Sequence, residues 1–380
     1  MRAFLIWERP LTTLDLLDRL IAFPTISADS NLPLIDFIRS YLTGRGFECR
    51  IVGNEHGNKA NLFATIGPKQ DDGILLSGHT DVVPVATQTW SSDPFKLSRE
   101  GTHLHGRGTT DMKGFLASVM AVADRVDAKA LKRPLHIAFS HDEEIGCVGV
   151  RSLIDMLAAE RFNASLCIVG EPTSMQIAVG HKGKTAARAH FRGQAGHSSL
   201  APRFVNAIHL ACDFVSVLRQ IQGDIVETGA TDSGYDIPYT TVHAGKIAGG
   251  EVLNIVAESA LVDFEIRHLA EDRVEEIMGR IHEQAGSSAE IEVRNAYPGL
   301  ATSTGSHAVS FARRLLDAAP TTKVSFGTEA GLFAERLGVE TVVVGPGNME
   351  QGHQPDEYIE EAQLQRCDLM LNRLIAQLCE

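Results

Sequence analysis

A histidine and an aspartate lie two residues apart at the end of a short apolar segment, Ser77-Gly78-His79-Thr80-Asp81. Residues two apart on a strand lie on the same side of it, so both side chains can face one site. In such a pair, one group can bind a metal ion while the other orients the imidazole by accepting its second N–H. The segment therefore predicts a metal-type histidine, His79, at the end of a strand, with Asp81 beside it.

A glycine-rich segment, GRGTTDMKG at residues 106–114, carries a carboxylate just before an apolar helical segment. Asp111 can cap that helix, as aspartate often does at helix starts. Its two oxygens can instead each contact one of two cations, because the glycines allow a close approach of the backbone. Both interpretations remain open from this segment alone.

Three acidic residues, Asp142, Glu143 and Glu144, follow the apolar segment 135–140. A run of acids is usually a solvated surface patch, but Ile145 comes next, where a surface run is less expected. Two adjacent carboxylates can divide the work of hydrolysis, because one can bind a metal ion while its neighbour removes a proton from water. This segment therefore offers both a ligand and a general base.

Glu171 and His353 also follow apolar segments. Each is ambiguous alone, but ligand-type groups at the ends of several strands are a stronger signal, because open α/β folds bind ligands at that edge of the sheet. A site of His, Asp and Glu side chains suits Zn²⁺, or a similar ion such as Co²⁺ or Mn²⁺. The six cysteines lie outside these positions, which disfavours a thiolate site.

The composition is that of a globular protein without a nucleic-acid or membrane partner. The chain has 380 residues, of which 44% are hydrophobic and 22% charged. Its net charge of −13 disfavours binding to a phosphate backbone. No apolar run reaches the roughly 20 residues of a membrane span, and the apolar run at residues 1–7 is too short for a signal peptide. Because no Cys-x-x-Cys motif or regular cysteine spacing occurs, we expect reduced thiols in a cytoplasmic protein.

Hydrophobic patterns predict one α/β domain interrupted by an α+β domain. Buried, mostly parallel strands are predicted at residues 62–66, 74–77, 135–140, 166–169 and 341–344, with helices at 11–22, 33–43, 112–124 and 306–318. Strands at 184–192, 240–247, 259–267 and 290–294, with helices from about 202 and at 274–281, have the β-α-β-β-α-β order of a ferredoxin-like domain. We therefore predict an α/β domain of residues 1–179 and 295–380 and an inserted domain of residues 180–294.

At these residues the chain resembles the M20 metallopeptidase family and, within it, the acetylornithine deacetylases. The resemblance covers nearly the whole chain, with the motifs in the same order. They are SGHTDVVP (77–84), GRGTTDMKG (106–114), HDEEIGCVGV (141–150), VGEPTSMQ (169–176), HKG (181–183), GQAGHSS (193–199), GTEAG (327–331) and GPGNMEQGHQPDEY (345–358). The combination of GEPTSMQ, HKG, TEA and GHQPDEY points to the acetylornithine enzymes.

The resemblance implies a mixed-sheet zinc-hydrolase domain and an inserted domain that serves as lid and dimerisation surface. It implies two zinc ions, for which cobalt can substitute. The ligands would be His79 and Glu171 for one ion, Glu144 and His353 for the other, and Asp111 between them. Asp81 would orient His79, and Glu143 would act first as general base and then as general acid.

The resemblance also implies a homodimer formed through the inserted domain. His197 would reach the active site of the partner subunit and stabilise the tetrahedral oxyanion. Asn254 and Arg267 match positions that the family uses near the substrate carboxylate, for which arginine is the suitable bidentate group. In the Thr328-Glu329-Ala330 segment, Thr328 and Glu329 are further candidates for substrate binding, and charge complementarity suggests that Glu329 meets the side-chain ammonium of ornithine.

These features predict metal-dependent hydrolysis of N2-acetyl-L-ornithine to L-ornithine and acetate, a step of arginine biosynthesis. The metal motifs do not separate this reaction from those of a succinyl-diaminopimelate desuccinylase, an acetylcitrulline deacetylase or a general aminoacylase. A catalytically silent, metal-binding dimer is a further alternative. Retention of Glu143 beside Glu144 argues against it, because a pure binder has no use for a base.

Overall fold

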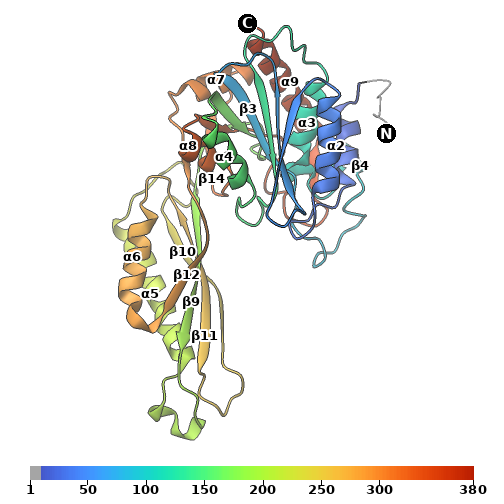
Figure 1. The fold of residues 1–380 in the computed structure, drawn as a ribbon. Helices are drawn as coiled ribbons and strands as arrows, with labels where there is room; N and C mark the ends of the chain where they lie inside the picture. The colour runs from blue at the N-terminus through green and yellow to red at the C-terminus, as the bar shows by residue number, and fades with distance from the viewer. Residues whose placement is uncertain (1–9) are drawn as a thin grey trace. The chain divides into compact units, whose positions relative to one another are not determined.

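The computed structural model describes residues 10–380, which form two compact units (Figure 1). The first unit contains residues 10–180, 302–322 and 328–380, and the second contains residues 181–301 and 323–327. The boundary expected at residue 294 falls inside a strand that continues to Tyr297. The N-terminal run that we interpreted as too short for a signal peptide lies outside the described residues.

A mixed sheet forms the centre of the first unit, with strands in the order β1-β2-β6-β3-β7-β15-β8. β3 runs parallel to β6 and β7, and β7 runs parallel to β15, whereas β1, β2 and β6 pair antiparallel. The strands span Glu48–Gly53 (β1), Ala60–Ile66 (β2), Gly73–His79 (β3), Leu135–Ser140 (β6), Ala164–Val169 (β7), Ile177–His181 (β8) and Thr341–Val343 (β15). The parallel centre brings the carboxyl ends of β3, β6 and β7 to one edge.

Helices cover both faces of this sheet (Figure 1). Helices α1, α2, α3, α7 and α9 contribute to one hydrophobic core on one face, and α4 and α8 lie against the other. Their bounds are Thr13–Ile21 (α1), Leu32–Thr43 (α2), Gly114–Ala123 (α3), Val150–Ala159 (α4), His307–Leu315 (α7), Ala330–Leu337 (α8) and Glu361–Leu378 (α9). This arrangement confirms the predicted α/β class.

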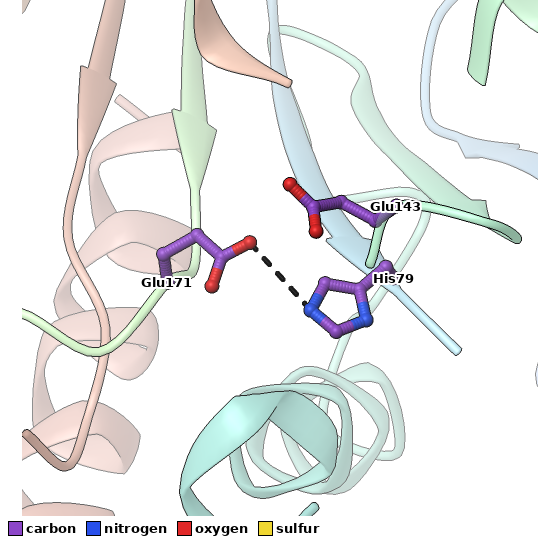
Figure 2. A group of neighbouring side chains, drawn as sticks. All are labelled: His79, Glu143 and Glu171. Atoms are coloured by element: carbon purple, nitrogen blue, oxygen red, sulfur yellow. Dashed lines mark ion pairs between the residues drawn. The ribbon is translucent and has the colours of Figure 1, made fainter. Parts of the chain in front are cut away.

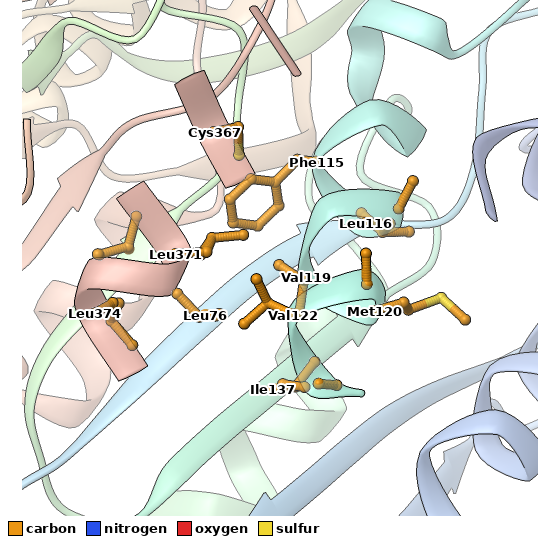
Figure 3. Packing of buried hydrophobic residues seen from close by; sticks show 14 of the residues in the cluster. Leu76, Phe115, Leu116, Val119, Met120, Val122, Ile137, Cys367, Leu371 and Leu374 are labelled. Carbon is orange, nitrogen blue, oxygen red and sulfur yellow. The ribbon is translucent and has the colours of Figure 1, made fainter. Parts of the chain in front are cut away.

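Helix α3 is the central helix of this core, and all of its residues are buried. Figure 3 shows Val119 and Val122 of α3 between the sheet and Leu371 and Leu374 of α9. Burying a side chain of this size contributes about 1.5–3 kcal/mol. The helix that follows Asp111 is therefore held firmly against the strands.

A small three-stranded sheet, in the order β16-β5-β4, joins distant segments of the first unit. Its strands span Ser98–Glu100 (β4), His103–His105 (β5) and Tyr358–Glu360 (β16), and the irregular helical turn η1 covers Thr109–Lys113. β16 pairs antiparallel with β5. The sheet thus fixes the segment before the glycine-rich turn to the segment after His353.

The second unit is a four-stranded antiparallel sheet in the order β10-β11-β9-β12, with α5 and α6 on one face (Figure 1). Its elements span Gly183–Arg192 (β9), Ala207–Thr228 (α5), Thr241–Gly249 (β10), Ser259–His268 (β11), Val274–Ala285 (α6) and Glu290–Tyr297 (β12). This is the β-α-β-β-α-β connectivity of ferredoxin-like domains. Short elements complete the description: Ser198–Arg203 (η2), Gly286–Ser288 (η3), Leu300–Ala301 (β13) and Thr321–Val324 (β14).

Within residues 10–380, none of the helices combines the length and the apolarity needed to cross a membrane.

Candidate metal centre

The predicted metal ligands meet at the carboxyl edge of the sheet in the first unit. His79 is the last residue of β3, and Glu144 and Glu171 follow β6 and β7. Asp111 lies in the turn before α3, and His353 lies in the loop between β15 and β16. Residues from five separate segments therefore meet in one place, as ligand groups at the ends of neighbouring strands should.

Asp111 lies between the two histidines. Its Oδ1 atom is 3.0 Å from Nε2 of His79, and its Oδ2 atom is 3.0 Å from Nε2 of His353. The other ring nitrogen of His79, Nδ1, faces away from Asp111 and lies 2.9 Å from the backbone oxygen of Asp81. Each imidazole thus directs Nε2, a usual metal-binding atom, toward one oxygen of the same carboxylate.

A second carboxylate accompanies each histidine. Glu171 Oε1 is 3.6 Å from His79 Nε2, and Glu144 Oε2 is 3.0 Å from His353 Nε2. Figure 2 shows Glu143 and Glu171 beside His79. Among the described residues, ligand atoms of His79, Glu143 and Glu171 lie within 4.8 Å of one another, and so do those of His79, Asp111 and Glu144. Glu143 therefore lies close enough to act on anything bound between these groups.

The structure gives Asp81 a different main contact from the one expected. Its carboxylate is 3.6 Å from His79 Nδ1, farther than its own backbone oxygen. The carboxylate instead accepts the backbone N–H groups of Glu143 (3.1 Å) and Glu144 (3.3 Å), and the Ser27 hydroxyl (2.7 Å). Asp81 therefore orients His79 chiefly through its main chain, while its side chain holds the turn that carries Glu143 and Glu144.

The turn after β6 is fixed from its other side as well. Asp142 has a φ of 56° and forms a buried ion pair with Lys59. The Cys147 thiol donates a hydrogen bond to Glu143 Oε1 at 3.2 Å. Glu143 is thus held through its backbone by Asp81 and through its side chain by Cys147.

The electrostatics of the site reflect a surplus of buried carboxylates. Burial raises the pKa of Glu143 and Glu171 well above the usual range, and burial together with Asp111 raises the pKa of Glu144 to about 7. Burial also opposes ionisation of Asp111, but hydrogen bonds from His353 and His79 hold its pKa below the usual value. Positive charge bound among these carboxylates would therefore stabilise their ionised form.

The donor set fits a pair of divalent cations. It offers two imidazole Nε2 atoms, one carboxylate with an oxygen toward each, and a further carboxylate on each side. Side chains of this kind suit Zn²⁺ and related ions. Two ions that share a carboxylate lie about 3.5–4 Å apart in known two-metal hydrolytic sites.

Thr328 and Glu329 immediately precede α8. The Thr328 hydroxyl accepts the Ala330 N–H at 3.0 Å. The Glu329 side chain is 1% exposed and accepts hydrogen bonds from the hydroxyl groups of Ser77 (3.3 Å) and Ser140. Both residues therefore have partners within the protein, and the contact of Glu329 with a substrate ammonium stays a prediction.

His197, Asn254 and Arg267 belong to the second unit. His197 Nδ1 is 2.8 Å from the Ser199 hydroxyl, and the Asn254 carbonyl accepts the Ser198 N–H at 3.0 Å. Arg267 donates to Glu265 (3.0 Å) and to the Tyr297 hydroxyl (3.2 Å). Their contacts with a substrate or a partner subunit stay predictions.

Two supporting residues were not foreseen from the sequence. Ser27 lies outside every motif, so no sequence signal could have identified its bond to Asp81. Cys147 lies inside HDEEIGCVGV, four residues after Glu143, and that spacing could have suggested the contact.

The chain is similar to known peptidases and deacetylases. The profile of peptidase family M20/M25/M40 matches residues 75–377. An acetylornithine deacetylase from Pasteurella multocida is 32% identical over 381 residues, which cover 96% of this chain and 98% of that protein. An M20 family metallo-carboxypeptidase from Sulfolobus solfataricus shares the fold with a TM-score of 0.81 at 19% identity, covering 97% of this chain and 99% of that one. A dinuclear metal-binding M20 peptidase from Bacillus subtilis does so with a TM-score of 0.67 at 16% identity, covering 96% and 97%.

Proposed function

The chain belongs to peptidase family M20/M25/M40, and we propose that it is a two-metal deacetylase that converts N2-acetyl-L-ornithine to L-ornithine and acetate. As a member of this family it is a hydrolase of amide bonds. The observation that carries the two-metal proposal is the position of Asp111, with one oxygen toward each histidine. The choice of substrate is supported by relatives named acetylornithine deacetylase at 32–34% identity.

In this proposal two zinc ions, or cobalt in their place, occupy the metal centre. His79 and Glu171 would hold one ion, Glu144 and His353 would hold the other, and Asp111 would serve both. When bound, such a pair polarises the amide carbonyl and makes a shared water molecule more acidic.

Glu143 is the proposed general base. It lies next to His79 and Glu171, and the ligand sets proposed above do not include it. Its carboxylate takes a proton from the attacking water as the oxygen adds to the amide carbon, and then gives that proton to the departing ornithine nitrogen. The hydrogen bond from Cys147 and the backbone bond to Asp81 keep this carboxylate in place between the two transfers.

The second unit supplies the proposed substrate and dimer contacts. Arg267 and Asn254 would bind the substrate carboxylate, and His197 would stabilise the oxyanion in the site of the partner subunit. The loop beside His197 exposes Leu253 completely, and Val252 and Ile255 by 53% and 48%. Adjacent exposed apolar side chains of this kind are typical of surfaces that another chain covers, which supports a homodimer formed through this unit.

We place the reaction in the cytoplasm, as part of arginine synthesis. The six cysteines are free thiols in the structure, and free thiols are usual in reducing compartments.

A substrate panel tests this proposal. The purified protein, supplied with zinc or cobalt, is assayed with N2-acetylornithine, N-acetylcitrulline, N-succinyl-diaminopimelate and N-acetylmethionine. We expect kcat/KM to be at least about tenfold higher for acetylornithine, a difference of about 1.4 kcal/mol in transition-state binding. Glu143→Gln is the matched control, and it should bind both ions while losing about 10²- to 10⁴-fold in kcat.

The possible outcomes separate the parts of the proposal. Faster turnover of another substrate would leave the metal chemistry standing and show that the substrate choice is wrong. No turnover of any substrate would favour the silent metal-binding dimer. A Glu143→Gln protein that keeps most of its kcat would exclude Glu143 as the base.

A further inference from the structure

A buried ion pair lies next to the metal centre without belonging to its ligand set. Arg107 and Glu357 are each 1% exposed, and Arg107 Nη1 lies 2.6 Å from Glu357 Oε2. Moving two charges out of water costs roughly several kcal/mol per ion before their mutual attraction is counted. A pair in this position therefore calls for a role beyond stability, and its remaining hydrogen bonds indicate what that role is.

The Glu357 branch of the pair holds the turn that carries Asp111. Glu357 Oε1 accepts the backbone N–H groups of Thr110 (2.9 Å) and Asp111 (3.1 Å), and Oε2 accepts that of Gly108 (3.1 Å). One carboxylate thus fixes three amides around the residue that lies between the two histidines. The position of the Asp111 side chain depends on this contact.

The Arg107 branch leads to the other side of the centre. Arg107 Nη2 donates to the side-chain oxygen of Gln88, and Gln88 Nε2 donates to the backbone oxygen of His353 at 2.7 Å. His353 has a φ of 61°, so its loop adopts a conformation that few L-residues occupy without support. Gln88 links that loop to the buried ion pair.

We propose that Glu357, Arg107 and Gln88 are positioning residues that set the placement of Asp111 and His353 relative to each other. Through that placement they determine the affinity for the ion held by His353 and Glu144. Gln88 bonds the loop that carries His353, whereas His79 and Glu171 come from the ends of β3 and β7, so a change at Gln88 should affect the two ions unequally. This inference rests on the proposed two-metal function.

Gln88→Met is the variant that tests this role. Methionine keeps the length of the side chain but cannot link Arg107 to His353, and Gln88 is only half-buried, so the protein should fold. The matched control is Gln70→Met, because Gln70 also donates to a backbone oxygen in the same unit, that of Lys132 at 2.6 Å. Titration of each metal-free protein with Co²⁺, followed by calorimetry and by visible absorption, measures the two binding steps. The step that His353→Ala abolishes identifies the ion concerned.

We expect Gln88→Met to weaken that step by about 10- to 100-fold, the usual effect of losing a partner behind a metal ligand. The other step and the melting temperature of the metal-free protein should stay as in the wild type and in Gln70→Met. Two normal binding steps in Gln88→Met would overturn this inference alone. Equal weakening of both steps with a lower melting temperature would overturn it too, because the network would then serve folding only. A wild-type protein that binds fewer than two ions would overturn the two-metal proposal and this inference with it.

Discussion

Asp81 shows how a single residue can serve the metal centre without reaching a metal ion. Its carboxylate accepts the N–H groups of both Glu143 and Glu144, and its own backbone oxygen orients His79. A buried N–H without a partner costs about 1–3 kcal/mol. Through its side chain and its backbone oxygen, Asp81 therefore ties the proposed base and two proposed ligands to the same point of the sheet.

Burial of His136 predicts a loss of stability in acid. This residue of β6 contacts Thr65, and burial lowers its pKa from 6.5 to about 4. The unfolded chain, with a histidine pKa near 6.5, therefore binds more protons than the folded chain between pH 6.5 and 4, and stability falls as the pH falls through that window. Between pH 7 and pH 5, the free energy of unfolding of His136→Phe should therefore fall by about 2 kcal/mol less than that of the wild type.

Urea unfolding at pH 5, 6, 7 and 8 measures this effect. The values at pH 7 and 8 serve as the control, because His136 is mostly uncharged in both states there and the two proteins should differ by a nearly constant amount. His181, whose pKa burial also lowers to about 4, should leave part of the acid dependence in the variant. Parallel curves for the two proteins down to pH 5 would show that His136 is not responsible.

The proposed metal ligands at strand ends were predictable from the sequence, whereas the hydrogen-bonding partners that hold the site in place were not. The positions of His79, Glu144 and Glu171 follow from short apolar segments and local spacing. The contact of Asp81 with Ser27 joins residues 54 positions apart, and that of Arg107 with Glu357 joins residues 250 apart. Nothing in local composition encodes such pairs, because they arise only when the strands have packed.

At the scale of elements, strands with continuous apolar sequence were the most predictable parts. The segments expected at 135–140 and 166–169 correspond to β6 and β7. The helix expected from about residue 202 begins at Ala207, because Asn206 caps it by accepting the Ile208 N–H at 2.9 Å. The hydrophobic patterns did not predict helices α4, α8 and α9, although Leu364, Leu371 and Leu374 of α9 are buried.

The contact between the ends of β7 and β15 leaves no space for a side chain at Gly345. A Cβ atom there would lie 2.0 Å from the Gly170 oxygen and 2.5 Å from the Glu171 oxygen. Gly345→Ala should therefore push the backbone of Glu171 away and cost about 1–3 kcal/mol or more of unfolding free energy. It should also weaken binding of the ion assigned to His79 and Glu171.

Gly223→Ala is the matched control, because Gly223 lies within α5 with no atom within 4 Å of an added Cβ. Alanine favours helix more than glycine does, so this variant should gain about 0.5–1 kcal/mol. Urea unfolding measures both variants. A stable Gly345→Ala protein with normal metal binding would show that the strand ends can separate without harm to Glu171.

At the scale of the whole molecule, the proposed activity would use residues of both units and two copies of the chain. The predicted ligands all come from the first unit, whereas His197, Asn254 and Arg267 come from the second. The hydrophobic pattern of the sequence predicted two domains because the periodicity of the strands changes near Gly180. The expected homodimer came from the family resemblance instead, because no periodic pattern reveals exposed side chains such as Leu253.

Mixing two inactive variants tests whether the sites are shared between subunits. Glu143→Ala lacks the proposed base, and His197→Ala lacks the proposed oxyanion contact. If each site takes Glu143 from one subunit and His197 from the other, a mixed dimer contains one complete site. Coexpression should then restore about one quarter of wild-type activity, because about half of randomly paired dimers are mixed. Activity no higher than the mean of the two variants would show that each chain uses its own His197.

The interrupted first unit has a consequence for synthesis on the ribosome. Chain elongation delivers all of residues 181–301 before β15, α9 and His353 exist. Domains generally fold as units while the chain emerges, so the inserted unit can fold while the sheet around it still lacks a strand. A nascent chain halted near residue 301 would thus expose an incomplete hydrophobic core. Roughly the last eighty residues would be needed to complete that core.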